Sequence, residues 1–195
     1  CTAAMATHPT DQHCTYPDGA TTATGNVASL VTTLRVNCNV ARAPWAWMGG
    51  SDPGQQPVHG TRGIAAAGNT PGARDQFVHA SDAAGNLWLF GGYAGNTYRN
   101  DLWRYDVEAG QWTWIAGSTA ANANGVYGTR GVADAGNVPG ARRNGAAWID
   151  TDGNFWLFGG SGYAAAGGAE SLNDLWKYDV ATDLWTWMGG ADAGG

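Results

Sequence analysis

The segment GNLWLFGG at residues 85–92 returns almost unchanged as GNFWLFGG at residues 153–160, an offset of 68 residues. The phrases GTRG and PGAR recur at the same offset. A further phrase, NDLWRYDV at 100–107, returns as NDLWKYDV at 173–180 with an offset of 73. The second part of the chain is therefore an internal repeat, and its five extra residues mark a loop between the FGG and NDLW phrases.

Each repeat reads as four short strands rich in Trp, Phe, Tyr, Leu and Val and bounded by Gly, Asp and Asn. In the second repeat we expect strands at 143–150, 154–159, 174–180 and 184–188. The WLF triplet is apolar on both faces of a pleat, which is typical of a strand covered on both sides. Four-stranded sheets that repeat in sequence and bury one another are the blades of a β-propeller.

The order of these phrases resembles the kelch repeat of galactose-oxidase-type propellers, in the long variant of bacterial surface and secreted proteins. The matching features are a Gly-Gly pair after an apolar strand, then NDLW-x-YD, then Trp-x-Trp. They fall at Gly91–Gly92, Tyr105 and Trp112, and at Gly159–Gly160, Tyr178 and Trp185. The resemblance implies an all-β fold with two complete blades, at about 74–117 and 142–190, and an orphan fourth strand at 45–48.

Residues 1–44 differ in composition, with no Trp and all three Cys, which places a domain boundary at Ala43–Pro44 before a propeller segment at 45–195. Residues 14–38 resemble the closing half of a small Ig-like β-domain that precedes such propellers in exported bacterial proteins. Cys14 and Cys38 would then point inward from two strands, so we expect a disulfide between them. Cys1 is left over, for a missing segment or a lipid anchor.

The charge of the chain argues against some partners. The formal net charge is −6, and residues 45–195 carry all of it. A negative chain is a poor partner for nucleic acid or for an anionic membrane surface. No apolar run is long enough to span a membrane, and we expect any signal peptide to have been removed. With the resemblance, this favours an extracellular or cell-surface location.

Strand parity predicts where a ligand would bind. Four antiparallel strands place the short first-to-second and third-to-fourth turns on one face of the propeller. The other face receives the long segments 49–73, 91–100, 117–141 and 159–173, and loops of this length are commonly functional. The candidate ligand-binding residues on this face are Arg62, Tyr93, Tyr98, Arg99, Tyr127, Arg130, Arg142 and Tyr163.

Each candidate has a structural alternative. The 11 Trp side chains could stack on sugars, but their repeat-equivalent positions in strands favour packing between blades. The GTRG and PGAR arginines could bind ligand carboxylates, or pair with Asp101 and Asp174 inside each repeat. The segment DTDGN at 150–154 spaces oxygen ligands as calcium loops do, but a hairpin turn is the simpler interpretation.

No enzymatic signature is present in the sequence. The copper site of galactose oxidase needs a Tyr–Cys cross-link, and residues 45–195 contain no Cys. We therefore expect no cofactor and a non-enzymatic binding module for a protein or glycan. Two alternatives stay open: a structural subunit of an extracellular assembly, and part of a propeller enzyme whose catalytic residues lie elsewhere. Further blades or other chains are expected to cover the open blade faces.

Overall fold

The computed structural model describes residues 12–15, 37–40, 47, 50 and 54–194. The chain divides into two compact units, Cys1–Trp47 and Met48–Gly195. In the first unit, β1 (Gln12–Thr15) and β2 (Asn37–Val40) pair antiparallel, and their register sets Cys14 opposite Cys38. The rest of the expected Ig-like domain, Cys1, and the orphan strand at 45–48 apart from Trp47 lie outside the described residues.

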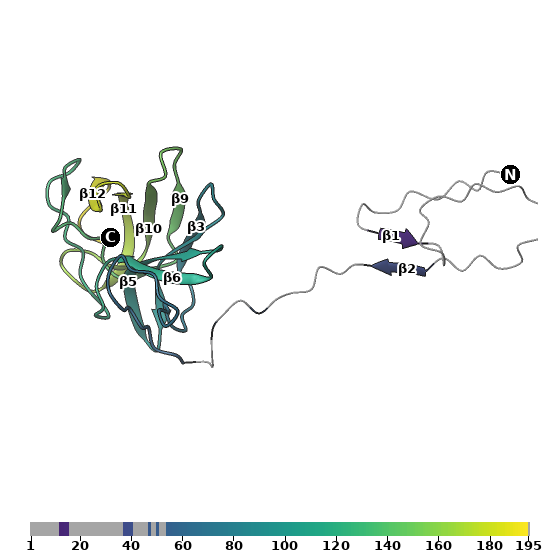
Figure 1. Cartoon of the computed structure of the whole chain (residues 1–195). Helices are drawn as coiled ribbons and strands as arrows, with labels where there is room; N and C mark the ends of the chain where they lie inside the picture. Colours follow the sequence, from purple (N-terminus) through teal and green to yellow (C-terminus); the bar gives the residue numbers. More distant parts are fainter. Residues whose placement is uncertain (1–11, 16–36, 41–46, 48–49, 51–53, 195) are drawn as a thin grey trace, which may run out of the picture. The chain divides into compact units, whose positions relative to one another are not determined.

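The second unit contains two antiparallel sheets, which confirm the all-β fold of four-stranded blades (Figure 1). Blade 1 runs in the order β3-β4-β5-β6. Its strands are β3 (Val78–Ser81), β4 (Leu87–Ala94), β5 (Thr97–Asp106) and β6 (Gln111–Ala116). Every pair is formed by neighbours in sequence, so short turns are enough to connect them.

Blade 2 repeats this order and adds short strands at both edges. Its strands are β7 (Ala133–Asp134), β8 (Arg142–Arg143), β9 (Ala146–Ile149), β10 (Phe155–Tyr163), β11 (Ala169–Asp179) and β12 (Leu184–Gly189). The expected innermost strand is interrupted between β8 and β9, where Asn144 takes a φ of 57°. Both β8 and β9 pair with β10 in the same register, so the interruption is a local break in one strand.

The segments 91–100 and 159–173 are mostly strand, which corrects the expectation of long loops there. In blade 1 the ladder continues past Gly92 to the pair Ala94–Thr97, and the hairpin closes at Gly95–Asn96. The Gly-Gly pair causes the register shift that precedes this extension. Gly91 has a φ of 63°, and a Cβ there would lie 2.5 Å from the Arg142 carbonyl oxygen, so only glycine fits.

The described parts of the two long crossing segments, 54–73 and 117–141, pair with the blades that they lead into. The segment before blade 2 supplies β7, which pairs with the outermost strand β12. Asn137 secures it, because its side-chain amide donates to the carbonyls of Val132 at 3.0 Å and Trp185 at 3.1 Å. Asn69 does the same in blade 1. The crossing segments therefore protect the outer edge of each blade and are not loops projecting from one face.

The hydrophobic core lies where the blades face each other. Figure 1 shows the sheets side by side, with β9 beside β3. Phe90 of blade 1 packs against Phe155 and, edge to face, against Trp185 of blade 2, with ring centroids 6.5 and 5.8 Å apart. The buried members of this cluster are Val78, Trp88, Phe90, Leu102, Ala116, Tyr127, Phe155, Leu157, Trp176, Tyr178 and Trp185. Three Trp side chains, Trp88, Trp176 and Trp185, belong to this cluster, and Trp187 packs against it. Trp103 is fully buried inside blade 1.

Candidate functional site

Three of the predicted ligand-binding tyrosines come together where the two long hairpins meet. Tyr93 on β4 and Tyr98 on β5 lie edge to face, with centroids 5.1 Å apart. Tyr163 at the end of β10 lies edge to face with Tyr98 at 5.7 Å. All three side chains are half-buried. Tyr93, Tyr98 and Tyr163 therefore form one aromatic cluster with contributions from both blades, which we call the tyrosine cluster.

A cation accompanies this cluster. The guanidinium carbon of Arg143 lies 4.7 Å from the Tyr93 ring centroid and 5.2 Å from that of Tyr98. These are cation–π distances. The Nε of Arg143 is buried and has no hydrogen-bond partner among the described residues. No described carboxylate lies within ion-pair distance of Arg143. Sequence reasoning placed Arg143 near this face but left it out of the candidate set.

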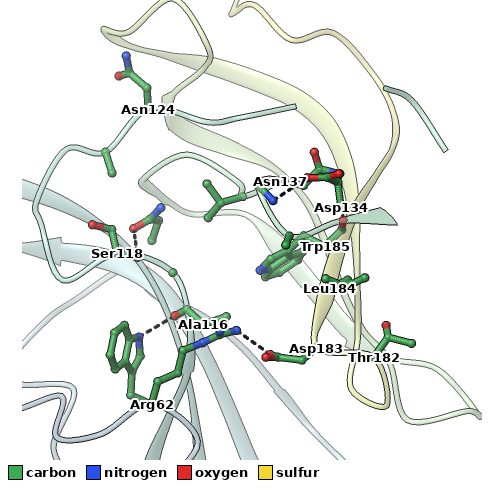
Figure 2. A pocket seen from close by; sticks show the side chains of 17 residues that line it. Arg62, Ala116, Ser118, Asn124, Asp134, Asn137, Thr182, Asp183, Leu184 and Trp185 are labelled. Atoms are coloured by element: carbon green, nitrogen blue, oxygen red, sulfur yellow. Dashed lines mark hydrogen bonds and ion pairs between the residues drawn. The ribbon is translucent and has the colours of Figure 1, made fainter. Parts of the chain in front are cut away.

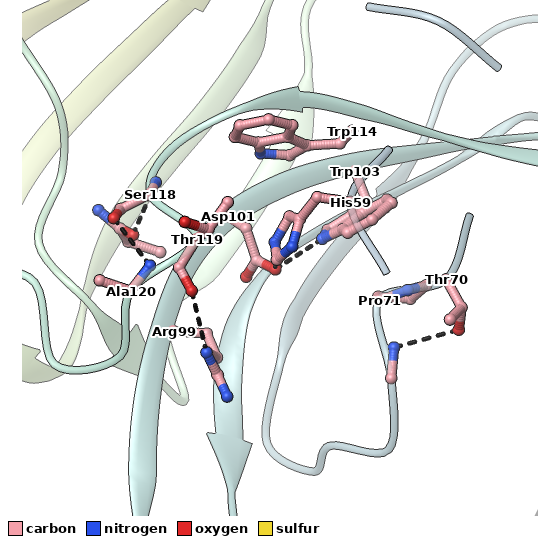
Figure 3. A network of polar contacts seen from close by, with 12 residues as sticks. His59, Thr70, Pro71, Arg99, Asp101, Trp103, Trp114, Ser118, Thr119 and Ala120 are labelled. Carbon is pink, nitrogen blue, oxygen red and sulfur yellow. Dashed lines mark hydrogen bonds and ion pairs between the residues drawn. The ribbon is translucent and has the colours of Figure 1, made fainter. Parts of the chain in front are cut away.

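Arg99 follows Tyr98 on β5 and therefore points to the opposite face of the strand. One of its terminal nitrogens donates to the Thr119 carbonyl at 3.4 Å, and its Nε is buried without a partner among the described residues. Figure 3 shows Arg99 with its bond to Thr119, near Asp101. The structure thus separates the side chain of Arg99 from that of its sequence neighbour Tyr98.

Arg142 and Tyr127 are interior residues. Arg142 is fully buried and donates two hydrogen bonds to the Asp174 carboxylate, at 2.6 and 2.7 Å. The same carboxylate accepts from the Tyr127 hydroxyl at 2.6 Å and from the Trp176 indole at 2.8 Å. The PGAR arginine Arg142 therefore pairs with Asp174 inside the repeat, as the structural alternative predicted. Neither Arg142 nor Tyr127 is accessible to a ligand. We therefore leave both out of the proposed contact surface.

The Asp174 network has charge consequences. Burial raises the pKa of a carboxyl, but the hydrogen bonds and charge of Arg142 outweigh it and hold the pKa of Asp174 below its usual value. Burial and the bond to Asp174 together raise the pKa of Tyr127. Asp174 is thus ionised and Tyr127 neutral, which is the arrangement that keeps the pair stable inside the protein.

Blade 1 contains the same network with one change, and Figure 3 shows its members His59, Asp101 and Trp103. Arg74 donates to both oxygens of Asp101, at 2.6 and 2.9 Å, and the Trp103 indole donates at 2.7 Å. His59 stands where blade 2 has Tyr127, and its Nε2 lies 3.1 Å from Asp101. Burial opposes ionisation of Asp101, and the bonds from His59 and Arg74 nevertheless keep its pKa low. All the polar capacity of Asp101 is used inside the protein.

The GTRG arginines contact the outer strands. Arg62 donates to the Ile115 carbonyl at 2.7 Å and to Asp183, in the β11–β12 turn, at 2.7 Å. Arg130 donates to the Gly190 carbonyl at 2.8 Å, and its guanidinium lies 4.7 Å from the Trp187 ring centroid. These contacts place Arg62 and Arg130 at the outer edges of the blades, apart from the tyrosine cluster.

The DTDGN segment is a hairpin turn. Asp150 accepts from the backbone of Asp152 and Asn154, from the Asn154 side chain, and from the Trp156 indole at 2.7 Å. Desolvation works against ionisation, but these donors lower the pKa of Asp150 to about 2. Asp82 holds the matching turn of blade 1 in the same way. Because each carboxylate accepts hydrogen bonds from its own turn, the hairpin turn describes this segment better than a calcium loop.

A groove between the blades was not predicted (Figure 2). It encloses about 460 Å³, with Arg62 and Ser118 on the blade 1 side and Asp134, Asp183 and Trp185 on the blade 2 side. The Trp185 indole nitrogen is buried without a hydrogen-bond partner in the described part of the chain. No sequence signal distinguished this groove, because it depends on how two blades splay apart.

Two kinds of site are absent from the described ranges. Among residues 12–15, 37–40 and 54–194, no group of three or more His, Cys, Asp and Glu side chains is placed to hold a metal ion. Within the same part of the chain, no helix is long and apolar enough to cross a membrane.

Comparison with known proteins agrees with this architecture. The profile of the family described as Kelch motif matches residues 84–116, from the turn before β4 to the end of β6. The matched segment covers β4, β5 and β6 of blade 1, and the sequence of these strands recurs in blade 2. A search of curated proteins finds no match. Among solved structures, the chain is similar to the one titled "Structure of YjhT", at 23% identity and a TM-score of 0.41, over 65% of this chain and 30% of that one.

Proposed function

We propose that this chain is part of an exported, non-enzymatic binding module that recognises a protein or a glycan through the tyrosine cluster. The observation that carries the proposal is the meeting of Tyr93, Tyr98 and Tyr163 around Arg143. Half-buried tyrosines offer flat apolar area together with a hydroxyl, a combination that suits both sugars and protein surfaces. Arg143 adds a guanidinium without an acidic partner among the described residues, which favours a ligand with an acidic group.

The test is binding to a panel of immobilised neutral and carboxylated glycans and of purified extracellular proteins. For a ligand that binds, Tyr98→Ala and Tyr163→Ala should each weaken affinity about tenfold, roughly the value of one lost aromatic contact. The control is Asp152→Ala, in the exposed turn between β9 and β10. Unchanged affinity in both tyrosine variants, or a loss in the control, would contradict the proposed site.

A structural subunit of an extracellular assembly is the second candidate. The observation in its favour is the set of exposed aromatic side chains on blade 2, including Trp148 and Phe158. Exposed apolar patches of this kind mark interaction surfaces. If this function is correct, no member of the glycan and protein panel should bind. The chain should instead associate with itself in solution.

A further inference from the structure

Each blade has the same apolar face. Among the described residues, blade 2 covers this face of blade 1, and nothing covers the same face of blade 2. In blade 1, Trp88, Phe90 and Leu102 face blade 2 and are at most 3% exposed. Their counterparts, at offsets of 68 or 73, are Trp156, Phe158 and Leu175. These point away from blade 1, and Phe158 is 47% exposed. The open face of blade 2 consists of Trp148, Trp156, Phe158, Leu175 and Met188.

The complementary surface lies on the far side of blade 1. Phe155, Tyr178 and Trp185 of blade 2 receive Phe90 and Trp88 of blade 1. Their repeat counterparts are Leu87, Tyr105 and Trp112, which we call the receiving face of blade 1. The receiving face is half-buried and lines an open groove of about 670 Å³, larger than the 460 Å³ of the groove between the blades. The described residues thus provide both halves of the interface.

We propose that the open face of blade 2 docks on the receiving face of blade 1 of a second copy of this chain. Phe158 would then lie against Leu87 and Trp112 of that copy, as Phe90 lies against Phe155 and Trp185. The contact is head-to-tail, since the two surfaces differ. Such contacts build a closed ring or an open chain of copies, according to whether the rotation closes.

Charge placement supports the same geometry. Within the chain, Arg62 crosses from blade 1 to Asp183 in the β11–β12 turn of blade 2. The counterpart of Arg62 is Arg130, which pairs with no described carboxylate. The counterpart of that turn is the β5–β6 turn, which contains the exposed Glu108. Gly110 stands at the position of Asp183, and Glu108, two residues earlier in the same turn, is the carboxylate that would pair with Arg130 in the proposed contact.

The first test measures the size of the 195-residue chain by sedimentation velocity over a range of concentrations. The wild type should form species larger than a dimer. Phe158→Asp and Leu87→Asp should each weaken association at least tenfold, because each buries a charge in the contact. An equimolar mixture of these two variants should form a 1:1 dimer and nothing larger, because each retains one intact face.

The matched control is Val180→Asp, which places the same charge at an exposed apolar position of blade 2 outside the open face. It should associate like the wild type. A wild type that stays monomeric at high concentration overturns the proposal. So does association that Val180→Asp abolishes equally, or failure of the mixture to form a dimer.

A charge reversal gives a second route if Leu87→Asp does not fold. Arg130→Glu and Glu108→Arg lie at exposed positions and should each weaken association severalfold. Mixing these two variants should restore association beyond a dimer, because one contact keeps the native pair and the other forms the reversed pair, and the double variant should recover association in a single chain. No effect of either reversal, with association intact, shows that the copies meet in another way.

Discussion

At the scale of residues, the repeat fixes one buried carboxylate in each blade. Asp101 and Asp174 are both fully buried, and each is held by an arginine from a PGAR phrase and by the indole two residues later. Because a buried ion is costly unless it is paired and hydrogen-bonded, these ion pairs fix the alignment of the crossing segment with its blade. The arginines are structural, although their sequence pattern also suited a ligand.

We expect Asp174→Ala to lower the free energy of unfolding by about 3 kcal/mol, because it leaves Arg142 charged and buried without a counter-ion. Chemical denaturation measures this. The matched control is Lys177→Gln, on the same strand at a half-buried position where the nearest carboxylate is 3.9 Å away, and it should leave the denaturation midpoint unchanged. Equal effects of the two substitutions would show that the buried pair contributes nothing special.

We expect the turn carboxylate of Asp150 to contribute to the free energy of unfolding in a way that is lost at acid pH. The pKa of Asp150 is about 2 in the folded protein against 3.8 as its ordinary value. A folded pKa below the unfolded one means that the unfolded chain binds more protons at acid pH. The stabilisation is therefore present above about pH 4 and is lost as the pH falls towards 2. Asp150→Asn should reduce the slope of unfolding free energy against pH in this window. An unchanged slope contradicts the assignment.

At the scale of elements, the crossing segments matter most. They run along the outer strand of the blade they lead into, and one buried asparagine in each makes the attachment. The asparagine amide donates to one carbonyl of its own segment and to one carbonyl of the outer strand. The segments thereby act as edge protection, which the sequence pattern of a long Gly-rich loop did not indicate.

Asn137→Ala should detach β7 from β12. The two lost hydrogen bonds, to Val132 and Trp185, predict a loss of about 1–3 kcal/mol in local stability. Amide hydrogen exchange should accelerate between residues 128 and 137 and stay slow in β10. The counterpart substitution Asn69→Ala serves as a comparison and should affect residues 60–69 alone. Exchange that accelerates across the whole blade would show that β7 is not a separate element.

Cys14 and Cys38 lie opposite each other in β1 and β2. The disulfide between them stays a prediction. Closing the loop between them would contribute about 3 kcal/mol by the loop-entropy estimate. Thiol counting on denatured protein should find at most one reactive sulfhydryl, that of Cys1. Three sulfhydryls in freshly purified, unreduced protein would rule the disulfide out.

Sequence reasoning was most successful where the signal was local. The phrases around Gly91 and Trp112 recur in order, so the number and order of blade strands could be predicted, and the fold confirms them. Strand lengths were underestimated, because Tyr93 and Tyr98 extend a hairpin by cross-strand pairing that no period reveals. The accessibility of Tyr127 could not be predicted, since it depends on the distant Asp174.

At the scale of the whole molecule, the contact between blades determines how the second unit unfolds. The core cluster draws side chains from both sheets, and Phe90 lies in it between Phe155 and Trp185. Each blade alone would expose the face it now buries. Because repeat arrays gain stability from neighbour interfaces, the two blades should unfold as one cooperative unit.

Phe90→Ala tests this coupling. Removing a fully buried phenylalanine should cost about 4 kcal/mol, from lost transfer energy and the cavity left behind. Its repeat counterpart offers a matched control, since Phe158→Ala makes the same chemical change where the side chain is 47% exposed, and its cost should be much smaller in dilute protein. Hydrogen exchange should show protection lost equally in β4 and β10 of the Phe90 variant, because neither sheet is stable once their shared core is damaged. If β10 kept its protection while β4 lost it, the blades would be independent folding units, and the interface would serve only to align them.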